Sequence, residues 1–237
     1  MTTKILRRTE VLKLGSGGVP SLLLRPDIDT PVPGVLLLHG YSSSKEVLSN
    51  TMGVALAMHG IASLSFDLPL HGRREEDMFE EAKTNPFGLL QHWKSALVEA
   101  KDAISWMAEH EAIDSDRIGI AGYSLGSYIA LQTASTEKSV KCVVVASGGD
   151  LPPTPWTSMV RMVTDPLLSV KKLKNRPLLI LHGVNDRTIR REQAQVLYDA
   201  APEPKAVKWY QSGHILPPQA ADDAAEWLIE QFSSVDS

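Results

Sequence analysis

The sequence has a single cysteine, no long apolar run and no excess of basic residues. Cys142 has no partner for an intramolecular disulfide, and its place in the apolar run 142–146 predicts a buried strand residue. No apolar run approaches the length of a bilayer span, and the first ten residues lack the apolar region of a signal peptide. We therefore expect a cytoplasmic protein that does not bind membranes.

The net charge and the absence of cofactor-binding motifs argue against further classes of protein. The formal net charge is −4, and acidic and basic side chains are interspersed, so there is no basic stripe for nucleic-acid phosphates. The sequence contains no metal-ligand spacing, phosphate-binding loop or dinucleotide fingerprint. We predict no metal, no cofactor and no nucleic-acid partner. The oligomeric state stays open, a homo-oligomer included.

Strand-length apolar runs alternate with longer stretches of helical spacing along the chain. Predicted strands cover residues 35–39, 62–66, 118–121, 142–147, 178–182 and 207–210. Predicted helices cover residues 46–59, 87–110, 125–135, 191–200 and 219–232. Such alternation implies β-α-β crossovers and a mostly parallel, twisted α/β sheet with helices on both faces. A hairpin of residues 10–14 and 19–25 brings the count to about eight strands, in a single domain of residues 1–237.

Two segments depart from the alternation, residues 70–86 and 148–175, and each follows a predicted strand. In an open α/β sheet the ligand crevice lies beyond the carboxyl ends of the strands, so both segments are candidates for a small lid or cap. The second segment has several prolines and predicts a short helix framed by turns. The alternative is a packed connection with no role in binding.

The pentapeptide Gly122-Tyr-Ser-Leu-Gly126 lies between a predicted strand and a predicted helix, which is the context that a G-x-S-x-G nucleophile requires. Gly122 and Gly126 let the chain turn sharply and leave the serine oxygen exposed at the tip. The helix amino terminus favours developing negative charge there. We predict that Ser124 is a nucleophile.

A serine nucleophile needs a base and a group that orients the base. In α/β sheets that carry the serine on such a strand-to-helix turn, both groups follow the serine in the chain. Asp186 and His214 each lie on a loop after a predicted strand, at the same sheet edge as Ser124. Asp150 also follows a strand and is the chief rival acid, whereas Asp67 is disfavoured because it precedes the serine.

The other histidines fit packing, capping, helix-interior or surface positions better: His39, His59, His92, His110 and His182. His71 is a candidate pocket residue. The oxyanion donors in this architecture are the N–H of the residue after the nucleophile and one from the loop after the early strand, which are Leu125 and Tyr41. Gly40 permits close backbone approach, and the Tyr41 side chain either reaches the substrate or only lines the loop.

Six short motifs of the chain form a recognisable combination: Leu37-Leu-His-Gly-Tyr41, Ser44-Lys-Glu46, Phe66-Asp-Leu-Pro-Leu-His-Gly72, Asp116-Arg-Ile-Gly-Ile-Ala-Gly-Tyr-Ser-Leu-Gly126, His182-Gly-Val-Asn-Asp186 and Gly213-His214. With them the chain resembles the α/β-hydrolase superfamily over essentially its full length. Within that superfamily, the sequence is similar to single-domain esterases related to dienelactone hydrolase and prolyl oligopeptidase. The resemblance implies a triad of Ser124, Asp186 and His214, with Tyr41 and Leu125 as backbone oxyanion donors.

Two positions depart from that family pattern. Dienelactone hydrolases proper use a cysteine nucleophile, and here the residue is Ser124, which favours ordinary ester hydrolysis. Members often have a second glycine after the elbow, where this chain has Ser127, and that puts nothing essential in doubt.

We expect a serine carboxylesterase that cleaves small or aromatic esters through an acyl-enzyme intermediate. Thioesterase, lactonase, hydroxycinnamoyl (feruloyl-type) esterase and small peptidase activities share the same machinery. A peptidase is disfavoured because such relatives usually carry an additional amino-terminal domain. A catalytically silent ligand-binding module is the non-enzyme alternative.

The expected partner is a small-molecule ester, and its pocket is the least determined feature of the sequence. The predicted substrate-binding residues are Trp156, Met159, Met162, His71 and Trp93, with Phe79 and Phe87 as further apolar candidates. Core packing explains the same residues nearly as well.

Overall fold

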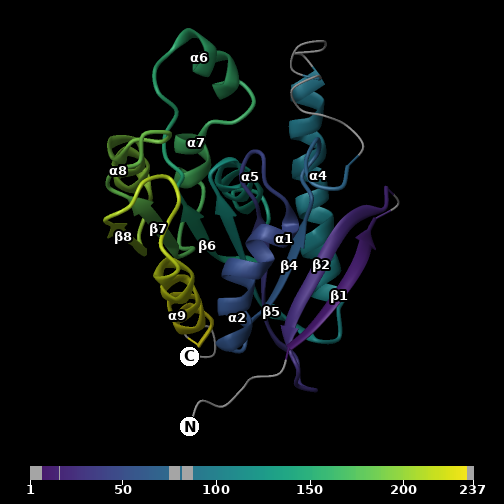
Figure 1. Ribbon diagram of the computed structural model, residues 1–237. Coiled ribbons are helices and arrows are strands. Elements are labelled where there is room, and N and C mark those ends of the chain that lie inside the picture. The colour runs from purple at the N-terminus through teal and green to yellow at the C-terminus, as the bar shows by residue number, and fades with distance from the viewer. Residues whose placement is uncertain (1–6, 16, 75–80, 82–87, 234–237) are drawn as a thin grey trace.

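The computed structural model describes residues 7–15, 17–74, 81 and 88–233, and a single eight-stranded sheet lies at their centre (Figure 1). The strands are β1 (Arg7–Leu14), β2 (Val19–Pro26), β3 (Val32–Leu38), β4 (Ala62–Phe66), β5 (Ile113–Tyr123), β6 (Val140–Ala146), β7 (Leu178–Gly183) and β8 (Lys205–Tyr210). Their spatial order is β1-β2-β4-β3-β5-β6-β7-β8, in which the β1–β2 and β2–β4 pairs are antiparallel and the other pairs parallel. The predicted mostly parallel sheet with an amino-terminal hairpin is confirmed.

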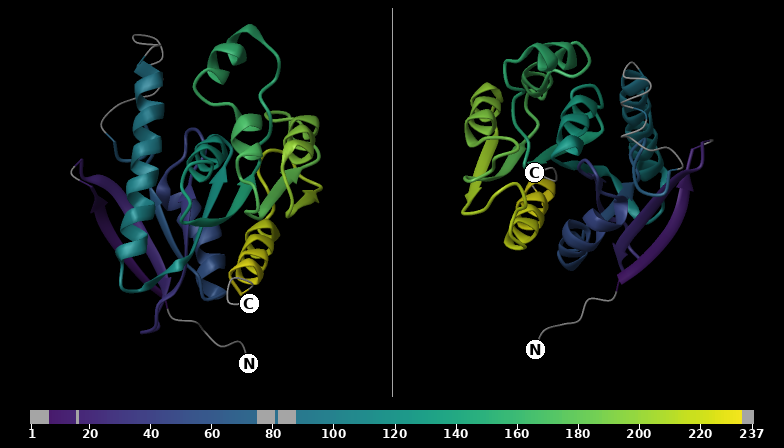
Figure 2. Two further views of the ribbon diagram at one scale, coloured as in Figure 1. Left: turned by 180° about the vertical axis from the view of Figure 1, so that it is seen from behind. Right: turned by 45° about the horizontal axis from the view of Figure 1, so that its top comes forward.

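Helices cover both faces of the sheet (Figures 1 and 2). One face carries α4 (Gly88–Glu109), α5 (Leu125–Ala134), α7 (Pro166–Lys171) and α8 (Arg191–Ala200). The other face carries α1 (Lys45–Leu48), the π-helical segment η1 (Ser49–Gly53), α2 (Val54–Met58) and α9 (Gln219–Ser233). Side chains of a strand point alternately to the two faces, so Leu36 of β3 joins the first core and Leu37 joins the second.

Central strands are buried on both faces because helices cover each of them, which explains their continuous apolar runs. Cys142 is fully buried in β6, as its apolar context predicts. Burial raises the pKa of its thiol, so the thiol stays protonated at neutral pH.

Several boundaries differ from the sequence prediction. The predicted helix 46–59 consists of α1, η1 and α2, and β5 begins at Ile113, five residues before the predicted 118–121. Residues 148–175 contain two short helices, α6 (Pro155–Arg161) and α7, where one was predicted. The α7 helix begins at Pro166 because the preceding Asp165 carboxylate caps the N–H groups of its first turn.

The structure describes the two candidate lid segments to different extents. Much of the first segment, residues 75–80 and 82–86, is outside them. In the second segment α6 stands beyond α7, at the end of the molecule toward which the parallel strands point (Figure 1). Its role as a lid stays a prediction. Within the described ranges, no helix combines the length and the apolar character needed to span a bilayer.

Candidate active site

Ser124 occupies a strained turn between β5 and α5. Its φ of 51° and ψ of −114° lie in a region that residues with a side chain rarely adopt. A Cβ on Gly122 would overlap the carbonyl of Gly126, and a Cβ on Gly126 would overlap the carbonyl of Leu38. Both positions therefore require glycine, and the resulting close packing holds Ser124 at the carboxyl end of β5.

A series of hydrogen bonds connects Ser124 to His214 and Asp186. His214 Nε2 lies 2.9 Å from Ser124 Oγ, and His214 Nδ1 lies 2.7 Å from Asp186 Oδ2. A carboxylate can only accept, so the Nδ1–H group donates to Asp186 and Nε2 is left to accept the serine hydroxyl proton. The structure thus brings together three residues that come from loops after β5, β7 and β8.

The Asp186 carboxylate is held rigidly in the loop after β7. Its Oδ1 accepts from the backbone N–H groups of Thr188 at 2.8 Å and Ile189 at 3.1 Å, and the side chain is fully buried. His182 lies 3.7 Å away, and burial lowers the pKa of this imidazole. His182 is therefore neutral at neutral pH.

The rival acids have other partners. Both oxygens of Asp150 accept from Arg161 at 2.7 Å, and the buried carboxylate of Asp67 pairs with Lys45 Nζ at 2.7 Å. Among the described contacts, Asp186 alone offers a carboxylate to His214.

The loop after β3 passes close to Ser124. A Cβ on Gly40 would lie 3.3 Å from Ser124 Cβ, and Gly40 and Tyr41 line the same cavity as Ser124. Leu125 is the first residue of α5, where the leading N–H groups have no partner within the helix. The two backbone positions predicted as oxyanion donors thus lie on the two segments that meet at Ser124.

His39 supports this loop from beneath. Its Nδ1–H donates to the Gly40 carbonyl at 2.8 Å, and its Nε2 accepts from the Leu68 N–H at 3.0 Å. Burial lowers the pKa of His39 to about 4, so the ring is neutral and both nitrogens are used structurally. This agrees with the packing role predicted for His39.

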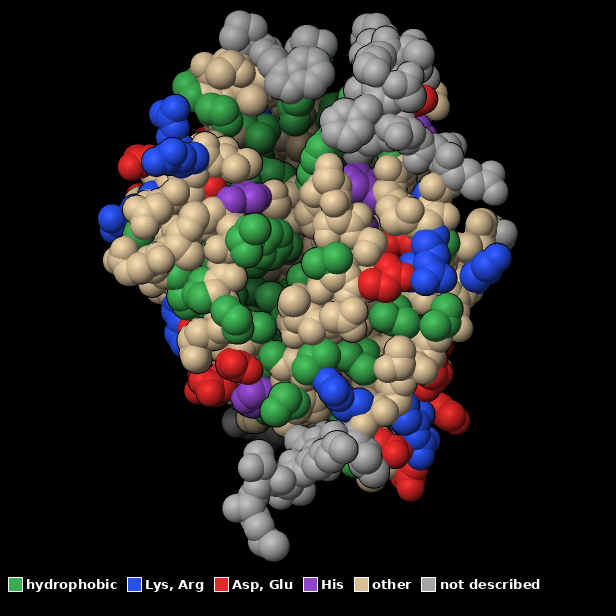
Figure 3. All heavy atoms as spheres, in the orientation of Figure 1, with side chains coloured by type: hydrophobic (Ala, Val, Ile, Leu, Met, Phe, Trp, Pro, Cys, Tyr) green, Lys and Arg blue, Asp and Glu red, His purple; other side chains and the backbone are tan. Residues whose placement is uncertain are grey.

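Ser124 and His214 open into an apolar cavity of about 800 Å³. One wall is the helical segment formed by α1, η1 and α2, and the other is the chain from Ile215 to the first turn of α9. Figure 3 shows hydrophobic side chains gathered around a hollow on the face that carries α2 and α9. We call this cavity the α2–α9 groove.

The predicted pocket residues whose side chains are described do not line this groove. Met162 is 80% exposed, and Trp93 donates from Nε1 to Gln132 Oε1 at 2.9 Å. Trp93 belongs to α4, which covers the opposite face of the sheet, so it cannot reach the groove. The side chains of Trp156 and Met159, like residues Phe79 and Phe87, lie outside the described part of the structure.

His71, the remaining predicted pocket residue, is buried behind Tyr41. The two rings meet edge to face with centroids 5.8 Å apart, and the His71 Nδ1–H donates to the Pro69 carbonyl at 2.8 Å. Burial lowers the pKa of this imidazole. His71 therefore packs behind the Tyr41 loop as a neutral ring.

Sequence reasoning missed the groove, although a signal for it was present. The helical segment has apolar residues beyond those that its buried core face needs, and Val47, Val54 and Met58 recur at helical spacing and line the groove. A second signal is the apolar run Ile215-Leu-Pro-Pro218 directly after His214.

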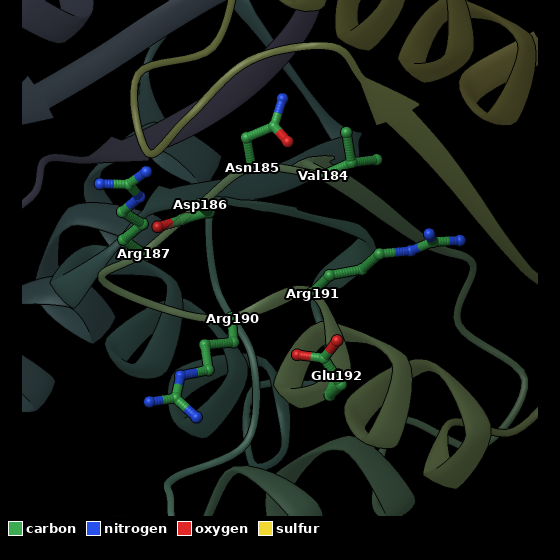
Figure 4. A pocket seen from close by; sticks show the side chains of 7 residues that line it. All are labelled: Val184, Asn185, Asp186, Arg187, Arg190, Arg191 and Glu192. Atoms are coloured by element: carbon green, nitrogen blue, oxygen red, sulfur yellow. The ribbon is translucent and has the colours of Figure 1, made fainter.

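Asp186 is one of the residues that line a second, smaller depression of about 580 Å³ (Figure 4). Arg187, Arg190 and Arg191 surround it, and Arg191 stacks on the Trp209 ring at 4.9 Å. Neither Ser124 nor His214 lines this depression. In the described part of the chain, no cluster of three or more His, Cys, Asp or Glu side chains is arranged to hold a metal ion.

A mostly parallel sheet that carries a strained serine elbow, with histidine and acid on later strand ends, defines an α/β-hydrolase. The dienelactone hydrolase family model matches residues 19–215, and the chain belongs to that family. The protein is therefore a hydrolase related to esterases.

Individual relatives agree with this assignment. The esterase YjfP of Escherichia coli (strain K12) is 27% identical over 86% of this chain and 91% of its own. The crystal structure of TT1662 from Thermus thermophilus superposes with a TM-score of 0.71 at 24% identity, over 96% of this chain and 99% of that one. A cold-adapted esterase from an Arctic intertidal metagenomic library gives 0.72 at 18% identity, over 98% and 96%. At these identities the two structures are evidence for the fold alone.

Proposed function

We propose that the protein is a serine carboxylesterase in which Ser124 is the nucleophile, His214 the general base and Asp186 the group that orients His214. The observation that carries the proposal is the pair of hydrogen bonds at His214, which accepts from Ser124 Oγ at 2.9 Å and donates to Asp186 Oδ2 at 2.7 Å, at the entrance of an apolar cavity. A cavity of about 800 Å³ is within the usual size of small-molecule sites.

The proposed reaction has two half-reactions. His214 Nε2 takes the hydroxyl proton while Ser124 Oγ attacks the ester carbonyl carbon, and the oxyanion is stabilised by the N–H groups of Tyr41 and Leu125. His214 then gives the proton to the alcohol oxygen as the C–O bond breaks, which leaves an acyl-enzyme. Water next loses a proton to His214 and attacks the acyl carbon, and Ser124 recovers its proton as the acid departs.

Labelling with a fluorophosphonate and turnover of p-nitrophenyl acetate test this proposal. Wild type should be labelled and should hydrolyse the ester, whereas Ser124→Ala should lose the label and fall in kcat by several orders of magnitude, about 10⁶ in the best-studied triad. Thermal unfolding of Ser124→Ala verifies that the variant folds. Failure of wild type to react with either reagent would overturn the proposal.

A further inference from the structure

We propose that the α2–α9 groove binds the unbranched acyl chain of the ester, with the chain running from Ser124 between the α1–η1–α2 segment and the start of α9. This inference rests on the proposed function, because it names the acyl group that the esterase would accept. Its first support is continuity: Ser124, Met58 and Ala221 all line one cavity. A group bound to Ser124 Oγ therefore has an apolar path away from the reacting carbonyl.

The exposure of the groove walls is the second support. Val47 and Met58 are each 55% exposed on one wall, and Ile215 is 83% exposed on the other. Exposed apolar side chains occur singly on most surfaces, but here they line a hollow that begins at a reactive serine. An aliphatic ligand would remove this surface from water, which contributes roughly 25 cal/mol per Å² buried.

The shape of the groove favours a linear chain. Val47 and Met58 are eleven residues apart on a helical segment, which corresponds to roughly 16 Å at about 1.5 Å per residue. Leu48 and Met52 line the groove and also belong to the buried core, whereas Val47, Val54 and Met58 line it without being part of that core. Core packing does not account for the apolar character of these three side chains, which suits a ligand.

The acyl side is the part of the ester that fits this position. Gly40 and Tyr41, on the loop proposed to hold the carbonyl oxygen, line the same cavity. The acyl group is joined to Ser124 in the acyl-enzyme that links the two half-reactions, whereas the alcohol must leave before water attacks. A groove walled by two helical segments can hold the group that remains.

The test is the acyl-chain dependence of kcat/KM for p-nitrophenyl acetate, butyrate, octanoate and decanoate. Each buried methylene is worth about 0.8 kcal/mol, so we expect kcat/KM to rise about threefold to fourfold per methylene until the groove is filled. Ala221→Phe narrows the groove and Val47→Asp places a charge in it, so each should lower the octanoate-to-acetate ratio of kcat/KM at least tenfold. Val98→Asp is the matched control, because Val98 is 56% exposed on α4, away from the groove, and its ratio should stay at the wild-type value.

The outcomes separate this inference from the proposed function. Hydrolysis of acetate with no gain from longer chains, or equal ratios in Val47→Asp and wild type, overturns the groove assignment and leaves the esterase proposal in place. A chain-length gain seen with alkyl acetates but not with alkanoyl esters overturns the acyl placement. Failure of wild type to hydrolyse any of these esters, together with absence of the fluorophosphonate label, overturns the proposed function itself.

Discussion

Tyr123, the residue before Ser124 in the chain, donates a hydrogen bond from its hydroxyl to the backbone carbonyl of His214 at 2.5 Å. Ser147 Oγ donates to the same carbonyl at 2.7 Å, from the end of β6. The loop that carries His214 is therefore tied to the strand ends on which Ser124 and its neighbours lie. We therefore expect Tyr123 and Ser147 to position His214, and neither was singled out in the sequence.

Removal of the Tyr123 hydroxyl should lower kcat while the KM of the ester changes little. A lost hydrogen bond costs about 0.5–1.5 kcal/mol. Tyr123→Phe should therefore reduce kcat roughly threefold to tenfold, because the backbone carbonyl of His214 loses one of the two hydroxyl groups that donate to it. Steady-state kinetics with p-nitrophenyl acetate measures this. Tyr210→Phe is the control, since its hydroxyl bonds Asp223 instead, and equal kcat in the two variants would argue against a positioning role.

Asp186 and Asp150 should differ sharply when each is changed to asparagine. An amide at position 186 can donate to Nδ1 and so stabilise the wrong tautomer of His214, an effect of about 10⁴ in kcat in the best-known triad. Asp150→Asn weakens the ion pair with Arg161 but leaves His214 unaffected, so its kcat should stay within severalfold of wild type. The reverse order of the two rates would identify Asp150 as the acid.

The buried ion pair of Lys45 and Asp67 should contribute strongly to stability. The side chains are 2% and 0% exposed, and Asp67 also accepts from the N–H groups of Lys45 and Arg73. Lys45→Met leaves a buried carboxylate without its cation and should lower the free energy of unfolding by about 3–5 kcal/mol. The double variant Lys45→Met/Asp67→Leu should recover part of this loss.

Urea unfolding measures these changes in the free energy of unfolding. Lys94→Met, at an exposed position of α4, is the control and should stay within about 0.5 kcal/mol of wild type. An unfolding midpoint for Lys45→Met equal to that of the control would show that the pair contributes little.

His39 should make stability depend on pH in the weakly acidic range. Burial lowers its pKa from 6.5 to about 4 in the folded protein, so between these values the unfolded chain binds a proton that the folded protein does not. The free energy of unfolding should therefore fall as pH drops from 6.5 to about 4, with no further change from this residue at lower pH.

The variant His39→Gln isolates that dependence, because glutamine retains a polar side chain and does not titrate. Its stability profile should be flatter over the same pH interval, although His71 and His182, whose pKa values are also lowered by burial, still contribute a slope. Denaturant titrations at a series of pH values measure both profiles. Parallel profiles in wild type and variant would contradict the assignment.

Local patterns in the sequence were sufficient to predict the fold and the turn that carries Ser124. Alternating strand and helix periods imply a mostly parallel sheet, because that is the packing in which both kinds of element bury their apolar faces. The G-x-S-x-G pentapeptide predicts the sharp turn between strand and helix, because close backbone contacts around this turn require glycine at Gly122 and Gly126. Asp186 and His214 could be named because carboxyl ends of parallel strands share one sheet edge.

Only the tertiary structure determines which residues line the cavity. Trp93 and Val47 are both apolar residues of amphipathic helices, and nothing in their local sequence indicates that α4 and α1 cover opposite faces of the sheet. The Tyr123–His214 hydrogen bond joins residues 91 positions apart, so it too depends on how the strands are ordered. The strained conformation of Ser124 follows from local turn geometry, whereas the shape of the groove depends on which segments the fold places side by side.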